Sequence, residues 1–417
     1  MELEKYSMGI GDRFCRQGKA QLDAIVKAKE SGIEIVPVWN KSHREHGIIG
    51  TVPADTRLEA DAAVRDRAWS GAYYVDADHI NLSNVDLFVD SSDFFTLDVA
   101  DYIGQAPDAE DLKAFVEKNR KYVGSLEIAG IDEAIEISRR DIERIGGKFL
   151  LAVKEAGKIY RHIEQAKGKG NFITEVSVDE SNEPQSPVEM LFILSAIADE
   201  GIPAQTIAPK FTGRFNKGVD YVGDALQFAK EFNQDIAVIN FAIAEFALPA
   251  NLKLSIHSGS DKFSIYAAIR DALQKFDAGV HLKTAGTTWL EELIGLAMAE
   301  GEGLEIAKDI YAGALARYDE LCKPYATVID IDKALLPTPD EVGKWAGAAF
   351  AAALRHDQSC AAYNLHFRQM LHLSYKIAAE MQGRFLDALA KYEDTIAPNV
   401  SDNIYERHIR PVFGIAG

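Results

Sequence analysis

Hydrophobic and polar positions alternate along the chain between two patterns. Short runs of β-branched and other apolar residues have the length and composition of buried strands. Eight such runs occur, at residues 33–39, 72–79, 125–130, 171–179, 204–211, 252–259, 279–286 and 325–331. A further apolar segment at 235–248 fits a strand or a helix, and as a ninth strand it would weaken the case for a barrel of eight.

The segments between most of these runs have helical spacing. The stretch 186–201 is an example, with Pro187 at a suitable first helical position and Gly201 just past the end. Alternating strands and helices specify a parallel sheet, and eight strands favour a closed (β/α)8 TIM-like barrel over an open doubly wound sheet. After residue 335 the pattern is helical throughout. We therefore predict an α/β catalytic barrel at 1–335 and a C-terminal helical extension at 336–417 packed on the barrel.

Composition and charge narrow the class of protein. Of the 417 residues, 47% are hydrophobic and 26% charged, as in water-soluble proteins, and no window resembles a membrane helix. The N-terminal MELEKYSMGIGDRF lacks the basic and apolar regions of a secretory signal, so we expect a cytoplasmic protein. The net charge of -19 would repel a phosphate backbone, so nucleic acid is not an expected partner. A buried pocket can still bind a small anion.

Cysteine spacing and missing motifs exclude several kinds of site. Cys15, Cys322 and Cys360 are odd in number and far apart, which argues against a disulfide framework and a thiolate zinc site. Any metal must therefore use histidines and carboxylates. The glycine-rich fingerprints of dinucleotide and nucleoside triphosphate sites are missing, and so is the G-x-S-x-G motif of serine hydrolases.

Histidines lie at the predicted strand ends, where the catalytic groups of an α/β barrel gather. His79, His257 and His281 each fall at or just inside the end of a different strand, so a barrel could bring them to one mouth. Three imidazoles with an open position suit a divalent cation such as Zn, Ni, Mn, Co or Fe. The alternative is that each histidine is an ordinary hydrogen-bonded residue.

The carboxylates of YYVDADHI raise a geometric question. The two-residue period of a strand puts Asp76 and Asp78 on one side and His79 on the other. The metal interpretation therefore requires the strand to end near Ala77, so that the loop redirects the last side chains. We predict Asp78 as general base and Glu175, on another strand, as its partner acid. Asp76 fits a structural role, in which it accepts hydrogen bonds from nearby backbone N–H groups.

Cationic side chains at the strand ends could hold an anionic substrate. Lys210, Arg214 and Lys217 follow the fifth strand, and Lys283 ends the seventh. A lysine there could form a Schiff base, but charge pairing with a carboxylate is the preferred interpretation. We predict a substrate-binding set consisting of Lys210, Arg214, Lys283 and Asp261.

Long stretches of the sequence resemble one enzyme family. The chain is similar, nearly from end to end, to the tagaturonate epimerases, also called tagaturonate/fructuronate epimerases. The resemblance is carried by MGIGDRFCRQGKAQL, PVWNKSHREHGIIGT, YYVDADHINLSNVDLF, SDFFTLDVAD, KFTGRFNKGVDY, LKLSIHSGSDKFSIY, HLKTAGTTWLEEL and NIYERHIRPVFG. It implies metal-dependent interconversion of D-tagaturonate and D-fructuronate. It also implies Asp78 as base, Glu175 as acid, and His79, His257 and His281 as ligands.

The chemistry of this reaction suits such a site. The two sugar acids differ at a carbon β to the ketone. The carbonyl does not acidify the C–H bond of that carbon, so simple enolisation cannot invert it. Retro-aldol cleavage and recondensation would invert it with a Lewis acid and a base, whereas transient oxidation would need a nicotinamide for which the sequence has no fingerprint. The alternatives are a related keto-sugar 4-epimerase, a class II aldolase or isomerase acting on a sugar acid, and an inactive sugar-acid binding protein.

Overall fold

Eight parallel strands close into a barrel, which confirms the predicted (β/α)8 fold. The computed structural model of the protein describes residues 1–414, apart from the side chain of Ala285. Around the barrel the strands follow the order β1-β10-β9-β8-β7-β4-β3-β2. Their bounds are β1 (Tyr6–Ile10), β2 (Val36–Ser42), β3 (Tyr74–Ile80), β4 (Phe94–Asp98), β7 (Ile173–Ser177), β8 (Thr206–Ala208), β9 (Lys253–His257) and β10 (Val280–Lys283).

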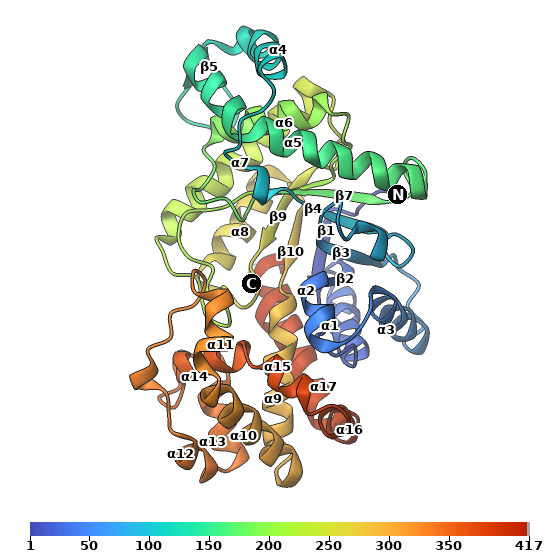
Figure 1. Cartoon of the computed structure of the whole chain (residues 1–417), viewed down its shortest axis with the longest axis vertical. Coiled ribbons are helices and arrows are strands. Elements are labelled where there is room, and N and C mark those ends of the chain that lie inside the picture. The colour runs from blue at the N-terminus through green and yellow to red at the C-terminus, as the bar shows by residue number, and fades with distance from the viewer. Residues whose placement is uncertain (415–417) are drawn as a thin grey trace.

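Helices cover the outside of the barrel, and Figure 1 shows the long α5 crossing one side of it. Capping boxes start α5 and α6, because Ser138 and Ser186 each exchange hydrogen bonds with the residue three positions on. The segment at 235–248, for which two structures were open, lies mostly within helix α7. The bounds of these helices are α1 (Gly18–Glu30), α2 (His43–Ile49), α3 (Pro53–Asp66), α5 (Arg139–Lys167), α6 (Pro187–Asp199), α7 (Ala225–Phe246) and α8 (Phe263–Phe276).

Two of the eight predicted strands are not barrel strands. At 125–130 the chain forms β5 (Gly124–Leu126), which pairs antiparallel with β6 (Ile135–Ile137) in a hairpin after helix α4 (Ala109–Asn119). Residues 325–331 form no strand, although Val328 accepts a backbone hydrogen bond from Lys217. Nearly all residues of both segments are exposed or half-buried, so their apolar residues do not mark a strand buried on two faces.

Two barrel strands were missed for physical reasons. In β1, Gly9 interrupts the apolar run, yet a Cβ at this position would lie 2.8 Å from Cγ of Lys283 on the neighbouring strand. The glycine therefore permits the close approach of β1 to β10. The other missed strand, β4, follows β3 through a 3-10 turn (Val85–Leu87) without a full helix, so the expected strand-helix alternation did not reveal it.

After β10 the chain is helical, and Figure 1 shows most of these helices gathered below the barrel in orange and red. Helix α17 returns to pack against α1 and α9, and α18 packs against α8. The predicted boundary between residues 335 and 336 stays a prediction. No helix in residues 1–414 is long and apolar enough to cross a membrane. The helices are α9 (Thr288–Met298), α10 (Gly301–Ala316), α11 (Tyr318–Cys322), α12 (Pro339–Gly343), α13 (Gly347–Leu354), α14 (Leu365–His372), α15 (Tyr375–Glu380), α16 (Gly383–Lys391), α17 (Glu393–Asp402), a π-helix (Asn403–Ile409) and α18 (Arg410–Phe413).

Candidate active site

A polar cavity of about 390 Å³ lies at the carboxyl ends of the barrel strands. Its wall includes residues that end β3, β4, β9 and β10. A second cavity of about 450 Å³ adjoins it, and the two share Asp179, His257 and Lys217. This is the end of a parallel barrel at which enzymes of this fold place their catalytic groups.

Three side chains in this cavity could share one cation. His79, Asp179 and His257 each offer one ligand atom, and these atoms all lie within 4.8 Å of one another. Nε2 of His79 lies 3.7 Å from one Asp179 oxygen, and Nδ1 of His257 lies 3.0 Å from the other. A set of two imidazoles and one carboxylate is a common catalytic ligand set for zinc and for other divalent transition metals.

His79 reaches this cluster through an irregularity in β3. The prediction that the strand ends near Ala77 was wrong, since β3 continues to Ile80. Between Ala77 and Ile80, however, the pairing with β4 shifts register, and His79 has a left-handed backbone with φ of +54°. Such a conformation is costly for a non-glycine residue and is typical of functional sites. In a regular strand the His79 side chain would point to the side opposite Asp78. The bulge turns it toward Asp179 and His257 instead.

Each imidazole is also held by a carboxylate on its other nitrogen. Nδ1 of His79 lies 3.0 Å from Asp78 Oδ1, and Nε2 of His257 lies 2.8 Å from Glu175 Oε1. Metal-binding histidines characteristically donate their second N–H in this way, which fixes the ring and its tautomer. The residues therefore fit a divalent cation at His79, Asp179 and His257.

The charges of the site agree with that fit. Burial disfavours a charged imidazole, but Asp78 and Asp179 raise the pKa of His79 well above its usual value. Against the same effect of burial, Asp179 raises the pKa of His257. The surrounding protein would raise the pKa of Asp179, yet His257 and His79 hold it well below the usual range. The carboxylates thus create a negative potential that positive charge between the two rings neutralises.

Lys283 ties together the carboxylates beneath this cluster. Its Nζ lies 2.8 Å from Asp76, 2.9 Å from Asp78 and 2.9 Å from Glu175, and it donates a further hydrogen bond to Thr96. Burial alone would raise the pKa of Asp78 and Glu175, but Lys283 lowers both. Asp76 differs, because burial outweighs Lys283 and raises its pKa to about 7. Lys283 was predicted to bind substrate. In the structure its ammonium group instead forms ion pairs with these carboxylates.

His281, predicted as the third ligand, lies deeper in the barrel. Its Nδ1 is 2.9 Å from the Ser7 hydroxyl, and the residue is fully buried. Register explains the position: Lys283 on β10 pairs with His257 on β9, whereas His281 pairs with Ser255. His281 therefore sits two residues, or about 6.6 Å, below the level of His257. At the upper level Asp179 is the third residue of the candidate cluster, where a histidine was predicted.

The other predicted substrate-binding residues divide between two places. Lys210 and Arg214 line the adjoining cavity, where Lys210 donates to the Ser181 carbonyl and Arg214 to the Ile329 carbonyl. Asp261 lies apart from both cavities. It is fully buried and binds Arg368 at 2.8 Å and His356 at 2.9 Å, which ties the loop after β9 to the C-terminal helices.

Several site residues were missed from sequence. Arg13, Glu45, Tyr375 and His372 line the cavity. The sequence has no signal that places Arg13, Tyr375 and His372 at the site, because β1 is not among the predicted strands and the C-terminal helices are predicted to pack on the barrel. Asp179 lies at the end of its predicted strand. It is absent from the predicted ligand set only because that set takes a third imidazole instead of a carboxylate.

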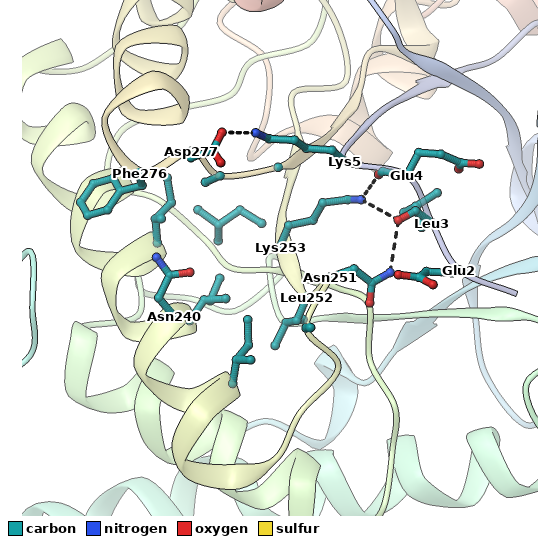
Figure 2. Close-up of a pocket in the computed structure, with 17 residues that line it drawn as sticks. Glu2, Leu3, Glu4, Lys5, Asn240, Asn251, Leu252, Lys253, Phe276 and Asp277 are labelled. Carbon is teal, nitrogen blue, oxygen red and sulfur yellow. Dashed lines mark hydrogen bonds and ion pairs between the residues drawn. The ribbon is translucent and has the colours of Figure 1, made fainter.

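A larger cavity, of about 620 Å³, lies at the opposite end of the barrel (Figure 2). Its wall includes the segment before β1, the start of β9 and the end of α8. Lys5 pairs there with Asp277, and Lys253 donates to the carbonyls of Leu3 and Glu4. Groups at this end of a TIM barrel ordinarily serve stability, so the smaller cavity is the candidate active site.

Lys253 makes this end of the barrel sensitive to pH. The residue is 5% exposed, and burial lowers its pKa to about 7. The unfolded chain, with an ordinary lysine pKa, binds more protons above pH 7, so stability should rise with pH up to about pH 10. Relative to Lys253→Met, the wild type should gain about 1–2 kcal/mol in unfolding free energy between pH 7.0 and 8.5. Urea unfolding at both pH values measures the difference, and a flat or falling difference would contradict the assignment.

Comparison with known proteins identifies the family to which the chain belongs. A sequence model of the tagaturonate epimerases matches residues 1–411. The tagaturonate/fructuronate epimerase of Thermotoga maritima is 26% identical over 418 aligned positions, which span 97% of this chain and 80% of that protein. A glycerol complex of fructuronate-tagaturonate epimerase from Cohnella laeviribosi shares the fold, with 22% identity, a TM-score of 0.79, and coverage of 99% of this chain and 82% of that chain. The family match covers nearly the whole sequence, and the chain belongs to the tagaturonate epimerase family.

Proposed function

We propose that the protein is a divalent-metal-dependent epimerase that interconverts D-tagaturonate and D-fructuronate. The observation that carries the proposal is the His79, Asp179 and His257 cluster at the mouth of a barrel whose chain belongs to this family. The names of the Thermotoga maritima and Cohnella laeviribosi relatives support the choice of sugar acids. The proposed cation is one of Zn, Ni, Mn, Co or Fe.

The three residues would hold the cation, and two neighbouring carboxylates would orient the imidazoles. When bound, a divalent cation supplies a Lewis acid that polarises the ketone oxygen of the sugar acid. Asp78 and Glu175 each hold the second nitrogen of one histidine, so the rings are positioned before substrate arrives.

Asp78 is placed to act as the base. Its side chain lines the cavity and is 15% exposed, and its low pKa keeps it ionised at neutral pH. In the proposed reaction Asp78 takes the proton of the hydroxyl on the carbon β to the ketone. The bond between the α and β carbons breaks, its electron pair forms an enediolate, and the β carbon becomes an aldehyde. The aldehyde presents its other face, the C–C bond re-forms, and the new alkoxide is protonated.

Glu175 suits a positioning role better than the predicted role of acid. Its carboxylate is fully buried, and Lys283 and His257 hold it ionised against the effect of burial. It therefore keeps no proton to donate at neutral pH. We assign the partner role to Glu180, which lines both cavities beside Asp179.

The direct test is product analysis by NMR. Metal-loaded protein incubated with tagaturonate should give fructuronate, and chelation with EDTA should stop the conversion. Net cleavage into shorter fragments would instead identify an aldolase. Binding of tagaturonate that survives EDTA without turnover would identify a binding protein.

Asp78→Asn separates base catalysis from metal binding. The asparagine oxygen can still accept the hydrogen bond from His79, but the amide cannot take a proton, so kcat at saturating metal should fall about 10²–10⁴-fold. Asp76→Asn is the matched control, because Asp76 also contacts Lys283 but is fully buried outside the cavity. Its kcat should fall less than about 10-fold. Equal losses in the two variants would exclude Asp78 as the base.

A further inference from the structure

One corner of the active-site cavity carries positive charge without a partner. Lys217 lines both cavities, from the loop after β8. Two other cations of the region have carboxylate partners: Arg13 pairs with Glu45, and Arg214 with Asp330. Within residues 1–414, Lys217 takes part in no ion pair of this kind.

Polar groups converge on the same corner. Lys217 Nζ lies 3.5 Å from the position that a Cβ on Gly259 would occupy, two residues after His257. Nε2 of His372 lies 2.7 Å from the corresponding position on Gly286, and this buried nitrogen has no hydrogen-bond partner among residues 1–414. A Cβ on Gly286 would also lie 2.2 Å from the Gly259 carbonyl oxygen, so the two glycines let these loops pack closely and bring the lysine and the imidazole to one part of the cavity wall.

Two arginines stand over tyrosines that line the cavity. The Arg13 guanidinium lies 4.0 Å from the Tyr375 ring centre, and that of Arg44 lies 5.2 Å from the Tyr325 ring centre. The hydroxyls of the two tyrosines are 3.0 Å apart. This arrangement surrounds the corner with fixed positive charge and hydroxyl donors.

The cavity therefore has one end lined by positive charge and another lined by negative charge. Burial lowers the pKa of Lys217, and Arg13 and Arg44 lower it further. Burial together with Arg13 and Lys217 also lowers the pKa of His372 well below its usual value. An anion placed here would relieve this repulsion, whereas Asp78, Asp179 and Glu180 on the metal side would repel it.

We propose that Lys217 binds the carboxylate group of the sugar-acid substrate, with Arg44 beside it. The ketone end of the substrate then points to His79, Asp179 and His257. The inference deepens the proposed epimerase function, on which it rests for the identity of the substrate. It also assigns the anion-binding role to a residue other than Lys283, whose charge three carboxylates already neutralise.

Calorimetry on metal-loaded protein tests the assignment. Lys217→Met should weaken tagaturonate binding about 10–100-fold, the loss expected for a charge-assisted hydrogen bond, while Lys217→Arg should recover part of it. Binding of a neutral ketohexose without the carboxylate should change less than about twofold. Lys230→Met, on the exposed face of α7, is the control for net charge and should leave both affinities unchanged.

The outcomes separate this inference from the proposed function. An unchanged tagaturonate affinity in Lys217→Met, or an equal loss for the neutral ketohexose, would overturn the assignment of Lys217. Those results would leave the epimerase proposal intact, because turnover of the wild type is measured separately. A charge-selective loss of binding supports the carboxylate site even if turnover is not found.

Discussion

Replacing His257 with alanine should remove both the bound metal and the activity. His257 offers one of the three clustered atoms proposed to hold the cation, and it contacts Asp179 and Glu175 at the same time. Loss of a residue that only orients a ligand typically costs about 10–100-fold in metal affinity or activity, so loss of a ligand should cost about 10³-fold or more. The metal content of the purified, dialysed protein should fall from about one ion per chain to a small fraction, as measured by plasma mass spectrometry.

His281→Asn is the matched control for this experiment. His281 is also a buried histidine of the barrel interior, but its nearest polar partner is Ser7, to which asparagine can still hydrogen bond. We expect this variant to keep its metal, and we expect His79→Ala and Asp179→Ala to lose theirs. Loss of metal from His281→Asn, with retention in Asp179→Ala, would show that the three-histidine set predicted from sequence is the true one.

The contrast between His257 and His281 shows where sequence reasoning reaches its limit. Strand composition predicted six of the eight barrel strands, and the position of polar residues at strand ends located the mouth of the site. The choice of ligands depends on register, which pairs His257 with Lys283 and leaves His281 one level lower. Register is set by packing across neighbouring strands, and a single strand does not encode it.

His79 illustrates a second limit. Regular alternation placed its side chain opposite Asp78, and only a register shift and a left-handed residue bring it to the cluster. The residue with this backbone is a histidine and not a glycine, so composition marks no bulge in the sequence. The cavity residues Arg13 and Tyr375 come from the end of the barrel after β1 and from α15, and only the closed fold shows that these segments meet.

Lys283→Met should destabilise the folded protein strongly. Lys283 is 5% exposed and is the shared partner of Asp76, Asp78 and Glu175, of which Asp76 and Glu175 are fully buried. Removing one member of a buried ion pair leaves uncompensated charge and costs about 3–5 kcal/mol. Urea unfolding of metal-free protein at pH 8 measures the loss. Glu175→Gln in the same chain removes one unpaired charge and should restore part of the stability, as in a double-mutant cycle.

The stability lost in Lys283→Met should increase with pH. In the wild type, Lys283 holds the pKa of Asp78 and Glu175 below the usual range against burial, so its stabilisation is complete above about pH 4. Without the lysine, burial raises both pKa values, and the folded variant then binds more protons than the unfolded chain. Its stability must fall as pH rises, and the difference from wild type should be larger at pH 8 than at pH 5.

Lys217→Met is the matched control for Lys283→Met, because it also removes a lysine that lines the cavity. Burial and the two arginines already lower the pKa of Lys217, so the fold gains nothing from its charge, and the variant should be within about 1 kcal/mol of wild type. A small loss for Lys283→Met at pH 8, or a loss that grows toward pH 5, would show that Asp76, Asp78 and Glu175 do not depend on Lys283. The low pKa values of Asp78 and Glu175 would then need another source of positive charge, and the protonated imidazoles of His79 and His257 are the nearest candidates.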